Sequence, residues 1–138
     1  MALREIIFRG KRLGKGEWVE GFFVEKKDPL LESDVRNAFI LAQARGDFFT
    51  TWFPVDPSTV GQYTGLKDKN GERIFEGDVL TVDGEDGFFV LEFQEDTARF
   101  VMSGDSVVVD FDNFWSYEVE VMGNIHDNYE LLEGGEEE

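Results

Sequence analysis

The sequence predicts a mainly β protein, with an N-terminal antiparallel β portion followed by a small five-stranded barrel and at most one short helix. Short runs of β-branched and aromatic residues recur along the chain, and clusters of Gly, Asp, Asn and Ser separate them. This pattern is typical of strands joined by tight turns. The chain has 14 Phe and only three Pro among 138 residues, which is enough apolar material for one compact unit with a sizeable core.

The predicted barrel occupies the second half of the chain. Its strands are expected at residues 79–82, 88–93, 97–102, 107–111 and 117–122. Leu91 and Phe93 alternate with Glu92, which predicts a sheet with one apolar and one solvated face. The run Phe75-Glu-Gly-Asp-Val-Leu-Thr-Val82, followed by a second strand that begins at Gly87, resembles the start of SH3-like barrels.

The N-terminal portion begins with a predicted hairpin. Its two strands are expected at residues 3–8 and 18–24, and the Gly-rich, basic segment 9–16 would join them. A returning strand is expected later, at residues 48–55.

Residues 33–46 admit two interpretations. Ser33 would cap a helix well, and that helix would have one apolar face made by Val35, Ala38, Phe39 and Ala42. Residues 38–41 equally predict a short apolar strand.

Adjacent aromatic residues recur at four places, Phe22-Phe23, Phe48-Phe49, Trp52-Phe53 and Phe88-Phe89. Neighbours in a strand point to opposite faces, so each pair puts an aromatic ring on both sides of its sheet. One interpretation is that the N-terminal sheet packs within the chain, and the other is a subunit interface. We expect both to contribute, with a homo-oligomer formed through the N-terminal half.

A polar motif links the two halves. Asp68-Lys-Asn-Gly71 predicts a tight hairpin turn, because Asn-Gly supplies the positive φ values that such turns need. Glu76 and Asp78 are two carboxylates around a glycine. They could accept backbone amides, bind a cation, or act as general acid and base. A second polar group, whose members could anchor backbone or contact a ligand, is Gln62, Tyr63 and Thr64.

Charge is distributed unevenly along the chain. Residues 1–74 carry 12 basic and 11 acidic side chains, whereas residues 75–138 carry one basic and 19 acidic side chains. An acidic half of this kind repels phosphates, so it is not expected to bind nucleic acid directly. The excess favours solubility or a surface for basic partners. Residues 133–138 are expected to form an acidic, solvated tail.

Several kinds of site are excluded by the residues themselves. The chain has no Cys, which removes disulfides, thiolate nucleophiles and thiolate metal sites and fits a reducing cytoplasm. No signal peptide or membrane-spanning run is expected. The single histidine, His126, is too little for a histidine-rich metal site or a Ser-His-Asp triad. We therefore expect no metal site, no cofactor and no catalytic residue set.

Five motifs, taken in chain order, resemble the YopX family of phage and prophage proteins. They are Arg4-Glu-Ile-Ile-Phe-Arg-Gly-Lys11, Glu17-Trp-Val-Glu-Gly21, Val55-Asp-Pro-Ser-Thr-Val60, the run from Gly61 to Val79, and Val121-Met-Gly-Asn-Ile-His-Asp-Asn-Tyr-Glu-Leu-Leu132. The resemblance implies a small phage gene product without an established enzymatic activity. It also favours strands over residues 33–46, with any helix confined to the first turn after Ser33.

These observations lead to an expected organisation and function. Residues 1–60 would form the N-terminal β portion, and residues 61–132 would form the hairpin, barrel and C-terminal segment of the same compact unit. The protein is expected to be a noncatalytic phage accessory protein that binds a host or phage protein. One alternative is an acidic decoy that occupies a basic nucleic-acid-binding protein. Another is a carboxylate-based enzyme that uses Glu76 or Asp78.

Overall fold

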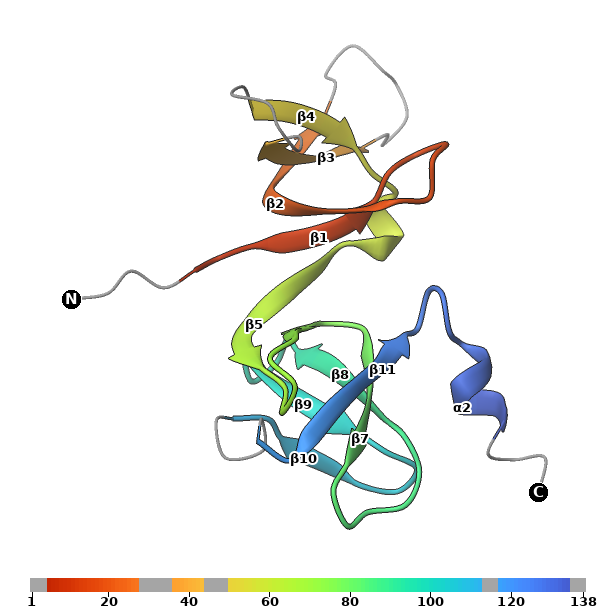
Figure 1. The fold of residues 1–138 in the computed structure, drawn as a ribbon. Coiled ribbons are helices and arrows are strands. Elements are labelled where there is room, and N and C mark those ends of the chain that lie inside the picture. Colours follow the sequence, from red (N-terminus) through yellow and green to blue (C-terminus); the bar gives the residue numbers. More distant parts are fainter. Residues whose placement is uncertain (1–4, 28–35, 44–49, 113–116, 135–138) are drawn as a thin grey trace. The chain divides into compact units, whose positions relative to one another are not determined.

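The computed structural model describes residues 5–27, 36–43, 50–112 and 117–134 (Figure 1). These residues form a mainly β protein, which confirms the predicted fold class. The chain divides into two compact units, residues 1–62 and residues 63–138. The strand β5 (Gly61–Lys67) begins in the first unit and ends in the second.

The first unit is an antiparallel sheet. Its hydrogen-bonded order is β4-β3-β2-β1-β5. The other strands in it are β1 (Phe8–Lys11), β2 (Trp18–Lys27), β3 (Arg36–Gln43) and β4 (Thr50–Pro54). An isolated bridge between Arg12 and Val55 joins the chain just after β1 to the chain just after β4, so the sheet curls. Ala38, Ile40 and Val55 are buried inside the curl, with Phe8, Val19 and Phe23 packed against them.

The N-terminal hairpin forms, but its first strand was predicted too early. β1 starts at Phe8 and pairs Phe8 with Gly21 and Lys11 with Trp18, so part of the expected connection 9–16 is strand. The reason lies in alternation. Gly10 faces inward, where a Cβ would lie 3.1 Å from the Val55 side chain, while the basic residues on either side of it face outward. The glycine and the charges that indicated a loop are therefore compatible with a strand.

The ambiguous segment contains a strand. β3 covers residues 36–43, and its central residue Ile40 is fully buried. Tertiary pairing on both edges, with β2 and with β4, outweighs the helical spacing of its apolar residues. The turn after Ser33, and the pair Phe48-Phe49, lie outside the described residues.

The second unit contains a five-stranded antiparallel sheet with the order β10-β9-β8-β7-β11. All five predicted barrel strands are present within a few residues of their predicted bounds. They are β7 (Asp78–Val82), β8 (Phe89–Gln94), β9 (Arg99–Ser103), β10 (Val108–Asp110) and β11 (Val119–Asn124). Within the described ranges, no pairing joins β10 to β11.

The core of this unit lies on one face of its sheet. Leu80, Leu91, Met102 and Val119 are all fully buried there, and for Leu91 the alternation with Glu92 predicted this. Phe93 is the exception, since 37% of its surface is exposed. It lies near the end of β8, where its ring packs edge-on against Phe100 with centroids 5.3 Å apart.

Three smaller elements complete the described structure. β6 (Arg73–Phe75) pairs with β5 to make the predicted hairpin, and a short 3-10 helix, η1 (Pro57–Thr59), follows β4. The C-terminal helix α2 (Glu130–Gly134) was not predicted. At five residues it is too short to show a helical period in the sequence, and Leu131 and Leu132 are its half-buried apolar residues.

Candidate functional site

The polar residues at the start of the central motif hold the hairpin together. The hydroxyl of Thr64 donates to the carbonyl of Ile74 at 2.8 Å and accepts from the backbone N–H of Leu66 at 3.2 Å. Tyr63 is 5% exposed, with the Phe75 ring 5.5 Å away and the Arg73 guanidinium carbon 5.5 Å from its own ring centre. Thr64 and Tyr63 are therefore held by contacts within their own unit, and little of either side chain is accessible to a ligand.

Gln62 lies in the first unit. It is half-buried and pairs with Phe8 where β5 meets β1. Gln62 and Tyr63 therefore pair with different neighbours of β5, the first with β1 and the second with β6.

The two predicted carboxylates have separate environments. Asp78 is 1% exposed, and its Oδ2 accepts the backbone N–H of Phe75 at 2.7 Å. Glu76 is half-buried on the other side of Gly77, whose φ of +93° allows the sharp turn into β7. A buried carboxylate that accepts a backbone amide acts as a structural cap. For Asp78, this arrangement supports the first of the three predicted roles, that of accepting backbone amides.

A third carboxylate, Asp68, organises the turn. It is 6% exposed and accepts three backbone amides, from Asn70 and Glu72 at 2.9 Å each and from Val121 at 2.9 Å. Its neighbour Lys69 donates to the Asp83 carboxylate at 2.8 Å, and this hydrogen bond holds the pKa of Lys69 above its ordinary value of 10.5. Asp68 and Lys69 therefore hold the hairpin turn in place through contacts within the chain.

The closing motif is a side-chain turn. The Asn124 side-chain oxygen accepts the backbone amides of His126 and Asp127 at 2.9 Å each. The Asn128 side-chain oxygen in turn accepts the amide of Asn124 at 3.2 Å. His126 is exposed on this turn. Across the described ranges, no group of three His, Cys, Asp or Glu side chains could hold a metal ion.

Aromatic side chains gather instead on the outward side of the first unit's sheet. The register places Phe22, Leu41 and Trp52 opposite one another across β2, β3 and β4, and strand alternation puts Trp18 and Phe39 on the same side. We call these five residues the outer face. Phe22 is 66% exposed and Trp52 is 49% exposed. The opposite side of the same strands carries Ile40, Ala38 and Phe23, which belong to the core.

Cationic side chains flank the outer face. The Arg9 guanidinium carbon lies 4.7 Å from the Trp18 ring centre and the Lys11 Nζ lies 5.8 Å from it. Lys26 Nζ lies 6.0 Å from the ring centre of Trp52. The Phe39 and Trp52 rings meet edge to face at 5.7 Å. The surface is therefore apolar and aromatic at its middle, with cations near both tryptophans and one exposed carboxylate, Glu20, opposite Arg9, a composition typical of binding surfaces.

The outer face was only partly predicted. The adjacent pairs identified Phe22 and Trp52, but Trp18, Phe39 and Lys26 were missed. The alternation of Trp18, Phe22 and Lys26 at even spacing along one strand was the available signal.

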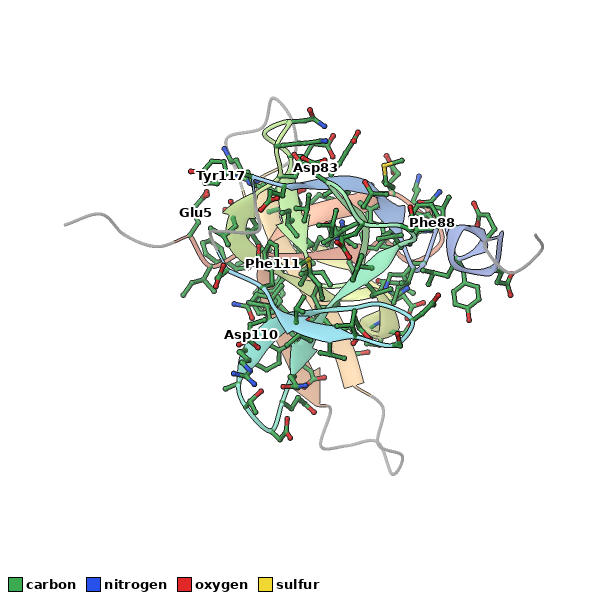
Figure 2. The ribbon with its side chains drawn as sticks, turned by 90° about the horizontal axis from the view of Figure 1, so that it is seen from below. Glu5, Asp83, Phe88, Asp110, Phe111 and Tyr117 are labelled. Atoms are coloured by element: carbon green, nitrogen blue, oxygen red, sulfur yellow. The ribbon has the colours of Figure 1, made fainter. Side chains whose placement is uncertain are left out.

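The described part of the second unit contains a surface pocket of about 340 Å³. Gly87, Phe88, Ser103, Gly104 and Asp105 line it together with Leu131 and Leu132 of α2. Figure 2 shows Phe88 beside the short helix, away from Phe111. None of the predicted site residues lies in this pocket, and it offers only two polar side chains, so it is a weaker candidate than the outer face.

Comparisons with known proteins show the family to which the chain belongs. A sequence model described as YopX protein matches residues 8–133. No curated protein matches the chain. Among solved structures, the chain is similar to the crystal structure of protein EF1440 from Enterococcus faecalis, with 24% identity, a TM-score of 0.56, and coverage of 93% of this chain and 98% of that one. That likeness shows the fold alone.

No helix among the described residues is long and apolar enough to span a membrane. The sequence match covers nearly the whole chain and includes four of the five motifs in full together with half of the first. The resemblance found in the sequence is therefore confirmed, and the chain belongs to the YopX family.

Proposed function

We propose that this protein is a noncatalytic phage or prophage accessory protein that acts as a protein-interaction module, and that the outer face is its contact surface. The observation that carries the proposal is the row of Phe22, Leu41 and Trp52, whose two aromatic members are 66% and 49% exposed. Exposed aromatic residues that gather on one face commonly mark association surfaces, and large aromatic side chains supply much of the energy of such contacts.

The polar motifs support a noncatalytic role. Asp68 and Asp78 are buried and accept backbone amides, and Thr64 bonds to backbone on both sides. A catalytic acid or base needs to reach a substrate, and these groups are directed at the chain itself. The return of β11 to pair with β7, so that the fifth barrel strand adjoins the first, supports an SH3-like interaction fold for the second unit.

The test is capture of a partner by the outer face. The tagged protein would be incubated with lysate from bacteria that carry a related prophage, and bound proteins would be quantified. The double variant Phe22→Ser/Trp52→Ser should reduce capture at least about tenfold, since loss of a contact worth about 1.4 kcal/mol already has that effect. Circular dichroism would verify that the variant is folded.

Tyr117 provides the matched control. It is an aromatic residue of the second unit and is 71% exposed, so Tyr117→Ser removes a comparable exposed ring from a different surface. Tyr117→Ser should leave capture unchanged. Equal loss in both variants, or no capture by the wild-type protein, would contradict the proposal.

An acidic decoy is the second candidate. Residues 63–138 carry 21 acidic and four basic side chains, whereas residues 1–62 carry nine of each. Asp83 and Asp110, which Figure 2 labels, are among the exposed carboxylates. A decoy would displace DNA from a basic protein, and its affinity would fall steeply with salt. Capture that depends on the outer face and persists at high salt would favour the interaction module instead.

A further inference from the structure

We propose that the outer edge of β4 binds an extended segment of a partner polypeptide by strand addition, and that this segment alternates apolar with acidic residues. This inference rests on the proposed function, because it assigns a partner chemistry to the same surface. Four observations support the inference. β4 is an edge strand, its backbone groups are directed outward, its residues carry no charge, and a cation lies beside it.

The backbone of β4 leaves hydrogen-bonding groups at the sheet edge. Val55 N–H donates to Ala38 O at 3.0 Å, so Val55 is directed toward β3, while the carbonyl of Pro54 accepts from Leu13 N–H at 3.0 Å on the opposite side. Successive residues of an antiparallel strand direct these groups to alternate sides. Trp52 and Thr50 therefore share the outward direction of Pro54.

The free edge is short and has a defined end. Pro54 has no N–H, and its carbonyl is already bonded to Leu13, so pairing stops there. Before it, β4 is the terminal strand in the sheet order, and no hydrogen bond reaches the outward groups of Trp52 from the described part of the chain. Thr50 to Trp52 is thus the stretch that a partner strand can pair with.

The side chains do not protect this edge. Proteins commonly guard an exposed edge with charges, a bulge or proline, and β4 reads Thr-Thr-Trp-Phe-Pro with proline only at its last position. Its pairing with β3 runs from Gln43–Thr50 to Phe39–Pro54 without a register shift. Trp52, at the middle of the strand, is 49% exposed. An added strand would bury it.

The cations indicate the charge of the partner. Lys26 lies 6.0 Å from the Trp52 ring centre, and Arg9 and Lys11 lie over Trp18 on the same face. A strand laid against β4 would place every second side chain on this face. Carboxylates there would lie near Lys26, which contacts the Trp52 ring, and apolar residues would cover Trp52.

The backbone edge of β4 favours a polypeptide over single-stranded nucleic acid, because an extended peptide can continue the hydrogen-bond ladder of the sheet and a nucleic acid cannot.

The experiment uses the full chain and two blocked synthetic peptides, one of alternating aspartate and valine and one of alternating lysine and valine. Binding would be followed by tryptophan fluorescence and by amide chemical shifts, with oligo(dT) as a third probe. The acidic peptide should bind, the basic peptide should bind at least about tenfold more weakly, and affinity for the acidic peptide should fall as salt rises.

Two variants test the two features separately. Thr50→Pro removes one outward N–H at the edge while the inward ladder of Thr51 and Phe53 remains, and Lys26→Glu reverses the nearby charge. Each should weaken acidic-peptide binding several-fold or more. Tyr117→Ser should not. Unchanged amide spectra away from the site would show that Thr50→Pro is folded.

Several results would overturn the inference. They are failure of the acidic peptide to bind, binding of oligo(dT) in its place, and equal affinity for the acidic and basic peptides. A dimer at tens of micromolar that Thr50→Pro dissociates would show that a second copy occupies the edge. If lysate capture requires Phe22 and Trp52 but is unaffected by Thr50→Pro and Lys26→Glu, the proposed function stands and strand addition fails.

Discussion

The Oδ2 of Asp68 accepts the backbone N–H of Val121 at 2.9 Å, across 53 positions of sequence. Its other oxygen accepts the amides of Asn70 and Glu72, so one buried carboxylate both closes the hairpin turn and attaches that turn to β11. Residues from two of the family motifs are thus joined by a single side chain.

Removal of this carboxylate should destabilise the second unit. Asp68→Ala leaves three backbone amides without their acceptor, and a buried group left unsatisfied costs about 1–3 kcal/mol. Because Asn70 and Glu72 are exposed, water can replace the acceptor for part of this loss, so we expect the free energy of unfolding to fall by about 2–4 kcal/mol in total. Urea unfolding followed by fluorescence measures this. Asp68→Asn keeps one acceptor oxygen and should lose less. A loss under about 0.5 kcal/mol for Asp68→Ala, the range of an ordinary surface substitution, would contradict this role.

Gly123 should be intolerant of any side chain. A Cβ at this position would overlap the Asn128 side chain, which accepts the Asn124 amide. We expect Gly123→Ala to destabilise the protein by about 1–3 kcal/mol, as overpacked positions do. Gly123→Ala combined with Asn128→Ala should cost less than the sum of the two single changes. A thermal-unfolding double-mutant cycle with strictly additive effects would argue against the contact.

The Lys69–Asp83 pair predicts a pH dependence. Because the folded-state pKa of Lys69 is raised, its contribution to stability is fully present below its ordinary value of 10.5 and is lost as the pH rises through the higher folded value. Lys69→Met should therefore lower stability slightly at neutral pH, and the difference should vanish in strong alkali or high salt. A difference that persists unchanged at high pH would point to packing rather than charge.

The two carboxylates around Gly77 should respond differently to substitution. Asp78→Ala should destabilise the fold by about 1–3 kcal/mol, because it leaves the Phe75 amide without its buried acceptor. Glu76→Gln should leave lysate capture unchanged. Thermal unfolding and the capture assay measure the two effects. A folded Glu76→Gln protein that has lost its biological effect while retaining capture would favour the carboxylate-based enzyme.

Much of the fold could be predicted from local pattern. The barrel strands carry both strong β composition and clear turns, so their positions were correct to within a few residues. β1 was misplaced because Arg9 and Lys11 look like loop residues, and only the close approach of Gly10 to Val55 explains why they lie in a strand. That contact joins residues 45 positions apart, which no local pattern reveals.

The candidate site was harder to predict for a related reason. The spacing of the polar residues in the central motif predicted a possible binding site. The partners of Asp68, Thr64 and Asp78 are instead backbone groups that only folding brings close. The outer face depends on cross-strand register. Phe22, Leu41 and Trp52 are far apart in sequence and become neighbours only when β2, β3 and β4 pair.

Hydroxyl-radical footprinting of the captured complex tests the outer face most directly. Phe22, Trp52 and Tyr117 are all well exposed in the free protein, at 66%, 49% and 71%, so all three should be oxidised there. In the complex, oxidation of Phe22 and Trp52 should fall sharply while that of Tyr117 stays unchanged. Protection of Tyr117 with Phe22 and Trp52 still fully oxidised would show that the partner binds elsewhere.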